Sequence, residues 1–133
     1  MPKVLLITSL ADAIVEELLV SAPGCIEADA CPASAASGKQ AERAASAQYL
    51  MLFPARLPDP VLQAARELEF VQLLTAGFDS IDLEACRERG VMVANNGGAN
   101  SIDVAEHAVA LMLAVYRRLV ELDVDTRAGN SGR

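Results

Sequence analysis

Residues 70–94 read FVQLLTAGFDSIDLEACRERGVMVA, and this stretch decides the fold. It begins and ends with short apolar runs, at 70–75 and 91–94, that are typical of buried strands. Between them the sequence predicts a turn and then a helix near 82–89, which Gly90 ends as its left-handed cap. A strand, a helix and a second strand in this order predict parallel strands of one sheet.

The same alternation of apolar runs and helical patterns extends towards the N-terminus. Residues 3–8 (KVLLIT) and 49–53 (YLMLF) predict two further buried strands, and 25–28 fits a weaker one. The Ala- and Ser-rich segment 28–47 predicts a loop followed by a short helix near 39–46. Five apolar strands separated by helices predict a flavodoxin-like, doubly wound α/β fold with a parallel five-stranded sheet and helices on both faces.

Helix starts are visible at two places. Ser9 and Asp12 form an S-x-x-D capping box, and Asp59 is a predicted N-cap with Pro60 at the first helical position. The helix after the capping box carries an apolar face made of Ile14, Val15, Leu18 and Leu19. Ligands of doubly wound sheets bind beyond the carboxyl ends of the strands. The loops expected to form a site are therefore 8–12, 53–57, 75–80 and 95–101.

Composition excludes several classes of protein. The chain has 133 residues, of which 53% are hydrophobic and 22% charged, as expected for one globular domain. Its net charge of −7 argues against nucleic acid as a partner, because phosphate binding needs clustered Lys and Arg. The longest apolar run, AVALMLAV at 108–115, is too short to span a bilayer, so no membrane association is expected.

The chain contains three cysteines, Cys25, Cys31 and Cys86, without a C-x-x-C pair, and one histidine. This pattern predicts buried thiols in a reducing cytoplasm rather than a disulfide framework. It also predicts that the chain has no metal site, because the ligand-spaced clusters that bind zinc are missing from the sequence.

Residues 95–108, NNGGANSIDVAEHA, raise the question of a phosphate site. The glycines of the chain nowhere satisfy G-x-G-x-x-G, so a dinucleotide pyrophosphate site is not supported. Gly97-Gly98 precedes a predicted helix N-terminus, which favours an anion, but Asp103 and Glu106 already offset the helix dipole. A carboxylate contact and a purely structural turn both remain open for the two glycines.

The helix predicted over 101–119 carries the histidine, His107. Nothing near His107 in the sequence could act as a nucleophile, and a structural role is favoured over catalysis. From Ala108 to Val115 every residue is apolar, so all sides of this helix need to be covered. A partner subunit or a second domain is the expected cover.

The stretch 73–119 resembles the D-isomer-specific 2-hydroxyacid dehydrogenases. In that family a strand ends in a small-Gly-x-Asp turn, an "[IV]D-x-x-A-x-x-x-G[IV]-x-V" segment follows, and "N-S-x-x-V-A-E-H" opens a long helix. The matching residues are Ala76-Gly77-Phe78-Asp79, Ile81-Asp82, Ala85, Gly90-Val91-Met92-Val93 and Asn100 to His107, with one residue fewer before Val104. The first strand and helix also suit the family.

The resemblance implies the roles of particular residues. Family members interconvert a 2-hydroxy acid and its 2-oxo acid with NAD or NADP, in a cleft between a flavodoxin-like substrate domain and a Rossmann domain. The turn at Ala76, Gly77 and Phe78 is implied to hold the substrate carboxylate through backbone N–H groups. Asn100 is implied to face the cleft, and Val104 to contact the nicotinamide of the cofactor.

The resemblance also implies a domain organisation. Residues 1–100 correspond to the substrate-binding domain, 101–120 to an interdomain helix that forms a homodimer through 101–119, and 121–133 to a truncated linker toward an absent Rossmann domain. The family's catalytic arginine and His–Glu pair lie further on, so we expect no catalytic residue in this chain. By itself the chain is expected to bind neither NAD nor NADP and to be inactive.

Two other classes of protein compete with the substrate-binding domain. A stand-alone dimerising interaction module derived from the same fold suits the acidic surface and the apolar helix equally well. A receiver domain or a flavoprotein ranks lower. Thr8-Ser9 and Phe53-Pro54 stand where a receiver needs acidic residues, and the chain has no Trp to stack on a flavin.

Overall fold

The computed structural model describes residues 1–54 and 56–130. It divides the chain into two compact units, Met1–Gly97 and Gly98–Arg133. The division falls close to the predicted boundary after residue 100. Each unit is described by itself.

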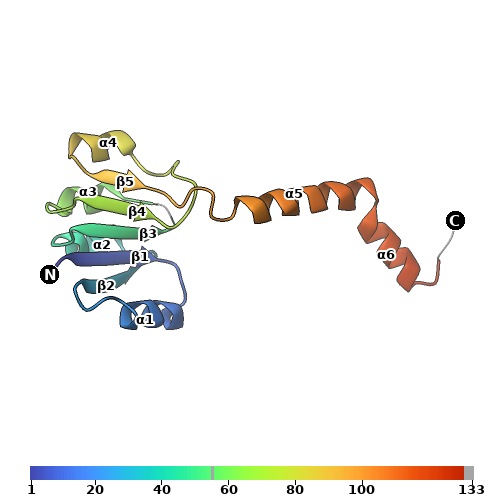
Figure 1. The fold of residues 1–133 in the computed structure, drawn as a ribbon, viewed down its shortest axis with the longest axis horizontal. Helices are drawn as coiled ribbons and strands as arrows, with labels where there is room; N and C mark the ends of the chain where they lie inside the picture. Colours follow the sequence, from blue (N-terminus) through green and yellow to red (C-terminus); the bar gives the residue numbers. More distant parts are fainter. Residues whose placement is uncertain (55, 131–133) are drawn as a thin grey trace. The chain divides into compact units, whose positions relative to one another are not determined.

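In the described part of the first unit, five strands form one parallel sheet (Figure 1). The strands are β1 (Lys3–Thr8), β2 (Glu27–Pro32), β3 (Tyr49–Phe53), β4 (Phe70–Leu73) and β5 (Met92–Ala94). Their order in the sheet is β2-β1-β3-β4-β5, with Val4, Tyr49, Phe70 and Met92 in one row across four of them. This order is the flavodoxin-like one, so the predicted fold class is confirmed.

The connections between the strands are helical. The helices are α1 (Asp12–Val20), α2 (Ser37–Ala44), α3 (Asp59–Ala64) and α4 (Leu83–Glu88). Helices α2 and α3 pack against each other, whereas α1 contacts β2 and α4 contacts β5 at opposite edges of the sheet (Figure 1).

The core forms where strand residues meet α2 and α3. Its largest fully buried side chains include Leu5, Leu50, Leu52, Val61, Val71 and Leu73. Burial alternates along β3: Leu50 and Leu52 are buried, whereas Tyr49, Met51 and Phe53 are half-buried. One face of β3 is therefore completely covered and the opposite face only partly, whereas Leu5 to Thr8 of β1 are buried on both faces.

The first helix differs from its prediction. Helix α1 begins at Asp12 after Ala11, whose side chain carries no hydrogen-bonding group, so the Ser9–Asp12 capping box is wrong. Ser9 is held at the strand end instead, because its N–H donates to the Phe53 carbonyl (2.8 Å). The apolar face of α1 is also less buried than its sequence suggests, with Ile14 and Leu18 each 47% exposed.

Two further differences concern α3 and β2. The N-cap of α3 is Pro58, so Asp59 lies in the first turn of the helix instead of capping it. Strand β2 is Glu27–Pro32, a range that was predicted mainly as loop. It pairs with β1 at the edge of the sheet, and its alternating burial leaves little apolar signal beyond the fully buried Cys31.

The helix after β4 agrees with its prediction. Asp82 is the N-cap of α4, and its carboxylate accepts a hydrogen bond from the Ala85 N–H (2.9 Å). Gly90 has φ +71°, the left-handed conformation predicted for the end of this helix.

The second unit contains α5 (Ser101–Tyr116) and α6 (Leu119–Arg127). The predicted continuous helix over 101–119 is therefore wrong: it is interrupted at Arg118, which adopts φ +50°. Residues 121–127, predicted as linker, are helical within α6, where the Arg127 Nε–H donates to both carboxylate oxygens of Asp123 one turn earlier. Residues 131–133 of the predicted linker lie outside the described part.

Apolar side chains cover both of these helices. Those that are more than half exposed are Ile102, Val104, Val109, Leu111, Met112, Leu113, Val115, Tyr116, Leu119, Val120, Leu122 and Val124. Within the described residues, no helix is long and apolar enough to cross a membrane.

The cysteines are not all buried as predicted. Cys31 and Cys86 are each 1% exposed, but Cys25 lies on the surface, in the turn before β2. Burial raises the pKa of the Cys86 thiol, and the neighbouring Asp82 carboxylate acts in the same direction. A raised pKa leaves less of the reactive thiolate at a given pH.

We therefore expect Cys25 to react with a disulfide reagent such as DTNB at least about tenfold faster than the two buried thiols, which require local opening. The rates are measured at neutral pH by absorbance. Cys25→Ser is the control and should remove the fast phase. Fast labelling of Cys31 or Cys86 in the folded chain would contradict the described burial.

Candidate functional site

The carboxyl ends of all the described strands lie at the same edge of the sheet, because the strands are parallel. Three of the four predicted site loops, 8–12, 53–57 and 75–80, follow β1, β3 and β4 at this edge (Figure 1). The fourth loop, 95–101, leaves β5 and crosses from the first unit into the second.

The turn after β4 is fixed from both sides. Leu74 continues the ladder by donating its N–H to the Leu52 carbonyl (3.0 Å). Within the turn, the Thr75 hydroxyl donates to the Gly77 carbonyl (3.0 Å). From the loop after β5, the side-chain amide of Asn95 donates to the Ala76 carbonyl (2.7 Å).

In the contacts within this turn and from the loop after β5, the carbonyl oxygens of the turn are the hydrogen-bond acceptors. The Thr75 carbonyl accepts from the Asn96 N–H (3.0 Å), and the Phe78 carbonyl accepts from the Ile81 N–H (3.0 Å). By contrast, the hydrogen bonds among residues 1–54 and 56–130 include none donated by the N–H of Ala76, Gly77 or Phe78. Consecutive free N–H groups in a fixed turn form an anion-binding concavity.

A cavity of about 290 Å³ lies beside this turn. It is lined by Leu73, Phe78, Leu83, Val93, Ala94 and Asn95. The lining side chains are apolar except for the Asn95 amide, backbone groups add polar surface, and Phe78 is 49% exposed. The arrangement suits a small molecule with a carboxylate at the turn and a short apolar remainder.

The other predicted site residues belong to the second unit. Asn100 is the N-cap of α5, with φ −119° and ψ 15°, and its side chain is exposed. Val104, in the first turns of α5, is 57% exposed. The structure therefore brings Ala76, Gly77 and Phe78 together in one turn and places Asn100 and Val104 in a separate unit.

A second hollow, of about 190 Å³, lies among the ends of β1, β2 and β3. Gln40, which the sequence analysis missed, is buried beside it, and its side-chain amide donates to the carbonyls of Ala33 and Ala35 (3.0 Å each). Gln40 thus fixes the loop after β2. In the sequence nothing distinguishes Gln40 from the polar residues beside it, Lys39 and Glu42, so this role gave no signal. Arg56 lines the same hollow.

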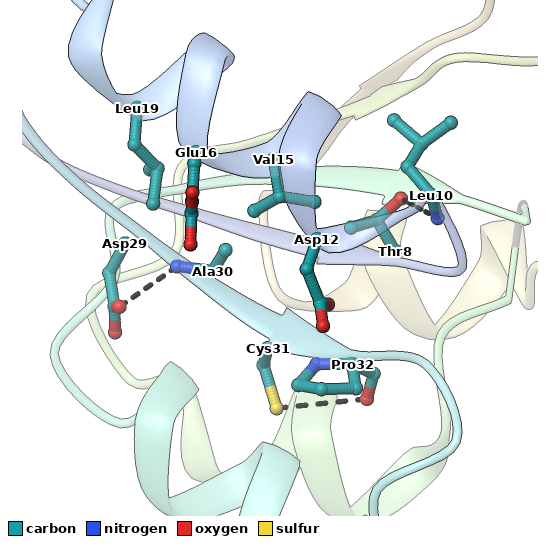
Figure 2. Close-up of a pocket in the computed structure, with 10 residues that line it drawn as sticks. All are labelled: Thr8, Leu10, Asp12, Val15, Glu16, Leu19, Asp29, Ala30, Cys31 and Pro32. Atoms are coloured by element: carbon teal, nitrogen blue, oxygen red, sulfur yellow. Dashed lines mark hydrogen bonds between the residues drawn. The ribbon is translucent and has the colours of Figure 1, made fainter.

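A third cavity, of about 280 Å³, lies between α1 and β2. Figure 2 shows Val15 and Leu19 projecting from α1 towards Ala30, with the carboxylates of Asp12 and Glu16 among them. Asp29 also lines the cavity, and the three carboxylates oppose the binding of an anion by like-charge repulsion. This repulsion therefore argues against a carboxylate ligand in this cavity.

The described residues contain no group of three or more His, Cys, Asp or Glu that could hold a metal ion. His107 lies exposed on α5. The glycines that precede α5 do not match the dinucleotide fingerprint, and Asp103 places a negative charge in the first turn of that helix. These residues do not fit a nicotinamide dinucleotide by themselves.

Known proteins share both the sequence pattern and the fold. The family model "D-isomer specific 2-hydroxyacid dehydrogenase, catalytic domain" matches residues 4–128. Glyoxylate/hydroxypyruvate reductase HPR3 of Arabidopsis thaliana is 39% identical over 90 residues, which are 66% of this chain and 28% of the relative.

Solved structures give the same result. A 2-hydroxyacid dehydrogenase from Ketogulonicigenium vulgare superimposes with a TM-score of 0.76 at 26% identity, covering 96% of this chain and 40% of that one. The NAD+-bound 3-phosphoglycerate dehydrogenase of Entamoeba histolytica, at 24% identity, shares the fold with a TM-score of 0.67 over 85% of this chain and 38% of that one.

The fold and the site define an α/β domain with a turn of backbone N–H groups, free among the described residues, at the carboxyl ends of its strands. The chain belongs to the D-isomer specific 2-hydroxyacid dehydrogenase family, whose catalytic-domain model covers nearly all of it. It spans well under half the length of the relatives it matches.

Proposed function

We propose that this chain is the substrate-binding part of an NAD(P)-dependent D-2-hydroxyacid dehydrogenase, in which the turn at Ala76, Gly77 and Phe78 holds the carboxylate of a 2-hydroxy or 2-oxo acid. The observation that carries the proposal is the turn itself. Its carbonyl groups are bound by Thr75, Asn95 and the neighbouring loop, while its N–H groups remain free among the described residues.

The physical reason is charge-assisted hydrogen bonding. Each N–H that binds a carboxylate contributes about 1.5–3 kcal/mol, and a preorganised turn loses little entropy on binding. The hydrogen bond from Asn95 to the Ala76 carbonyl keeps the turn in place. The apolar cavity beside Phe78 takes the remainder of a small 2-oxo acid.

Residues of the second unit complete this function in the proposal. Asn100 faces substrate and cofactor, Val104 contacts the nicotinamide, and helix α5 forms a homodimer, beyond which the chain leads towards a Rossmann domain. The cofactor, NAD or NADP, supplies hydride transfer when it is bound. Because the residues of this chain do not fit the dinucleotide, we expect that the chain alone neither binds NADH nor reduces a 2-oxo acid. Its free cysteines suit a cytoplasmic location.

Asn95→Ala tests the site. Removing the amide breaks its hydrogen bond to the Ala76 carbonyl and loosens the turn. We therefore expect glyoxylate to bind at least about tenfold more weakly, which is the effect of losing one hydrogen bond of ordinary strength. Calorimetric titration of the whole chain measures the dissociation constant.

Asn130→Ala is the matched control, since Asn130 is an exposed asparagine near the end of the second unit. This variant should bind glyoxylate as tightly as the unmodified chain does. Equal glyoxylate affinity in Asn95→Ala and in the unmodified chain would count against the proposed turn.

A stand-alone dimerising interaction module is the second candidate. The exposed apolar side chains of α5 favour it, because a helix with such a surface is normally covered. The candidates differ in ligand binding: the module dimerises without affinity for a 2-oxo acid, whereas the substrate-binding domain has both properties.

A further inference from the structure

We propose that Asn96 is a site of spontaneous deamidation, at the segment that joins the two units of the chain. Asn96 is followed by Gly97, directly before the division between the units at residues 97 and 98. Because glycine lacks a Cβ, the backbone at Gly97 reaches the conformations in which its nitrogen approaches the Asn96 side chain. This inference rests on local chemistry and is independent of the proposed function.

Both reacting groups are available. Asn96 is exposed and lies outside the helices and strands, between β5 and α5. Its backbone N–H is fixed by the Thr75 carbonyl (3.0 Å). The hydrogen bonds of the described residues include none made by the Asn96 side chain or by the N–H of Gly97. The Asn96 side-chain amide and the Gly97 backbone nitrogen are thus both free of hydrogen bonds to the described residues.

The neighbouring asparagines are protected by comparison. The side-chain amide of Asn95 donates to the Ala76 carbonyl (2.7 Å), and the residue that follows it is not glycine. Asn100 is followed by Ser101, whose N–H donates to the Gly98 carbonyl (3.2 Å) at the start of α5. The structure therefore favours reaction at Asn96 over both of these positions.

The reaction needs only water as a co-reactant. The deprotonated backbone nitrogen of Gly97 attacks Cγ of Asn96, a C–N bond forms, and the side-chain nitrogen leaves as ammonia after taking up protons from solvent. The product is a five-membered succinimide. Water then opens either of its carbonyls, which gives an aspartate or an isoaspartate at this position, without a change in oxidation state. The isoaspartate lengthens the main chain by one carbon between β5 and α5.

One consequence rests on the proposed function. The new carboxylate is attached to the residue whose N–H holds Thr75, directly before the turn at Ala76, Gly77 and Phe78. A negative charge beside the proposed carboxylate site opposes anion binding. We therefore expect deamidated chain to bind glyoxylate more weakly than fresh chain.

Incubation of the whole chain in mildly alkaline buffer tests the proposal. Peptide mass analysis should show the mass gain of amide-to-carboxyl conversion in the peptide that contains Asn96, and an isoaspartyl methyltransferase assay should detect isoaspartate there. In Gly97→Ala we expect the rate to fall at least about tenfold, because the added Cβ hinders ring closure.

Gly97→Ala is expected to fold normally. Gly97 does not adopt a left-handed φ, and an added Cβ meets only the Asn95 side chain, at 3.4 Å or more, among the described residues. Asn96→Gln provides a second control and should show no mass gain in this peptide.

Amide loss that is faster at Asn95 or Asn100, or equal rates in Gly97→Ala and the unmodified chain, would overturn the proposal. Deamidation at Asn96 in a chain that never binds glyoxylate would instead refute the proposed function and leave this inference intact.

Discussion

Replacing Leu52 by alanine is expected to lower the free energy of unfolding of the sheet unit by about 2–5 kcal/mol, the cost of an unfilled cavity in a packed core. Leu52 is fully buried in β3. It lies in register with Ile7 of β1 and Leu73 of β4, so three neighbouring strands lose contacts together.

Urea denaturation followed by circular dichroism measures this loss. Val20→Ala is the matched control: Val20 is 87% exposed at the end of α1, and its change should stay within about 0.5 kcal/mol. A loss at Leu52 no larger than that of the control would show that the sheet is not packed as described.

The second large effect is expected in assembly. Met112→Glu combined with Val115→Glu should convert the proposed homodimer into monomers. These residues are 69% and 79% exposed in the chain and lie three apart, hence on neighbouring positions of one α5 face. Burying unpaired carboxylates in a helix interface costs several kcal/mol, so we expect the dissociation constant to rise at least about 100-fold.

Sedimentation velocity at micromolar concentration distinguishes the two states. Val20→Glu, which adds a carboxylate to an exposed apolar position of the first unit, is the control and should remain dimeric. A monomeric unmodified chain would contradict the proposed homodimer. Dimers that persist in the double variant would place the interface elsewhere.

Most of the sheet could be predicted because its strands are buried parallel strands. Such strands have near-continuous apolar sequences, as KVLLIT and YLMLF do. The helix over 83–88 was predictable from its borders, since Asp82 caps its start and Gly90 provides the left-handed end. In these elements local propensity and tertiary packing favour the same structure.

Elements at the edges of the fold were harder to predict. Strand β2 has a strand neighbour on one side, so Cys31 suffices as its buried residue and acidic residues occupy alternate positions. The Ser9–Asp12 pattern has the right spacing for a capping box. However, the Ser9 N–H donates a hydrogen bond to the carbonyl of Phe53 in β3, which holds Ser9 at the strand end and away from the helix. Both outcomes depend on long-range contacts that a local pattern does not contain.

The candidate site was predictable in part. The turn at Ala76-Gly77-Phe78 follows from the family resemblance and from the rule that ligands bind at the carboxyl ends of strands. The residues that fix the turn were not foreseen: Asn95 belongs to a different loop, and its contact with the Ala76 carbonyl arises only when β4 and β5 pair. The break at Arg118 was also unforeseen, because a basic residue is normally favourable near the end of a helix.

Nuclear magnetic resonance of the ¹⁵N-labelled chain during titration with glyoxylate tests the carboxylate-binding turn most directly. The proposal predicts saturable shifts that are largest for the backbone amides of Ala76, Gly77 and Phe78. These shifts should be absent when a neutral aldehyde of similar size replaces glyoxylate. Shifts that are largest around Ser37 and Arg56, or that fail to saturate, would contradict the proposed site.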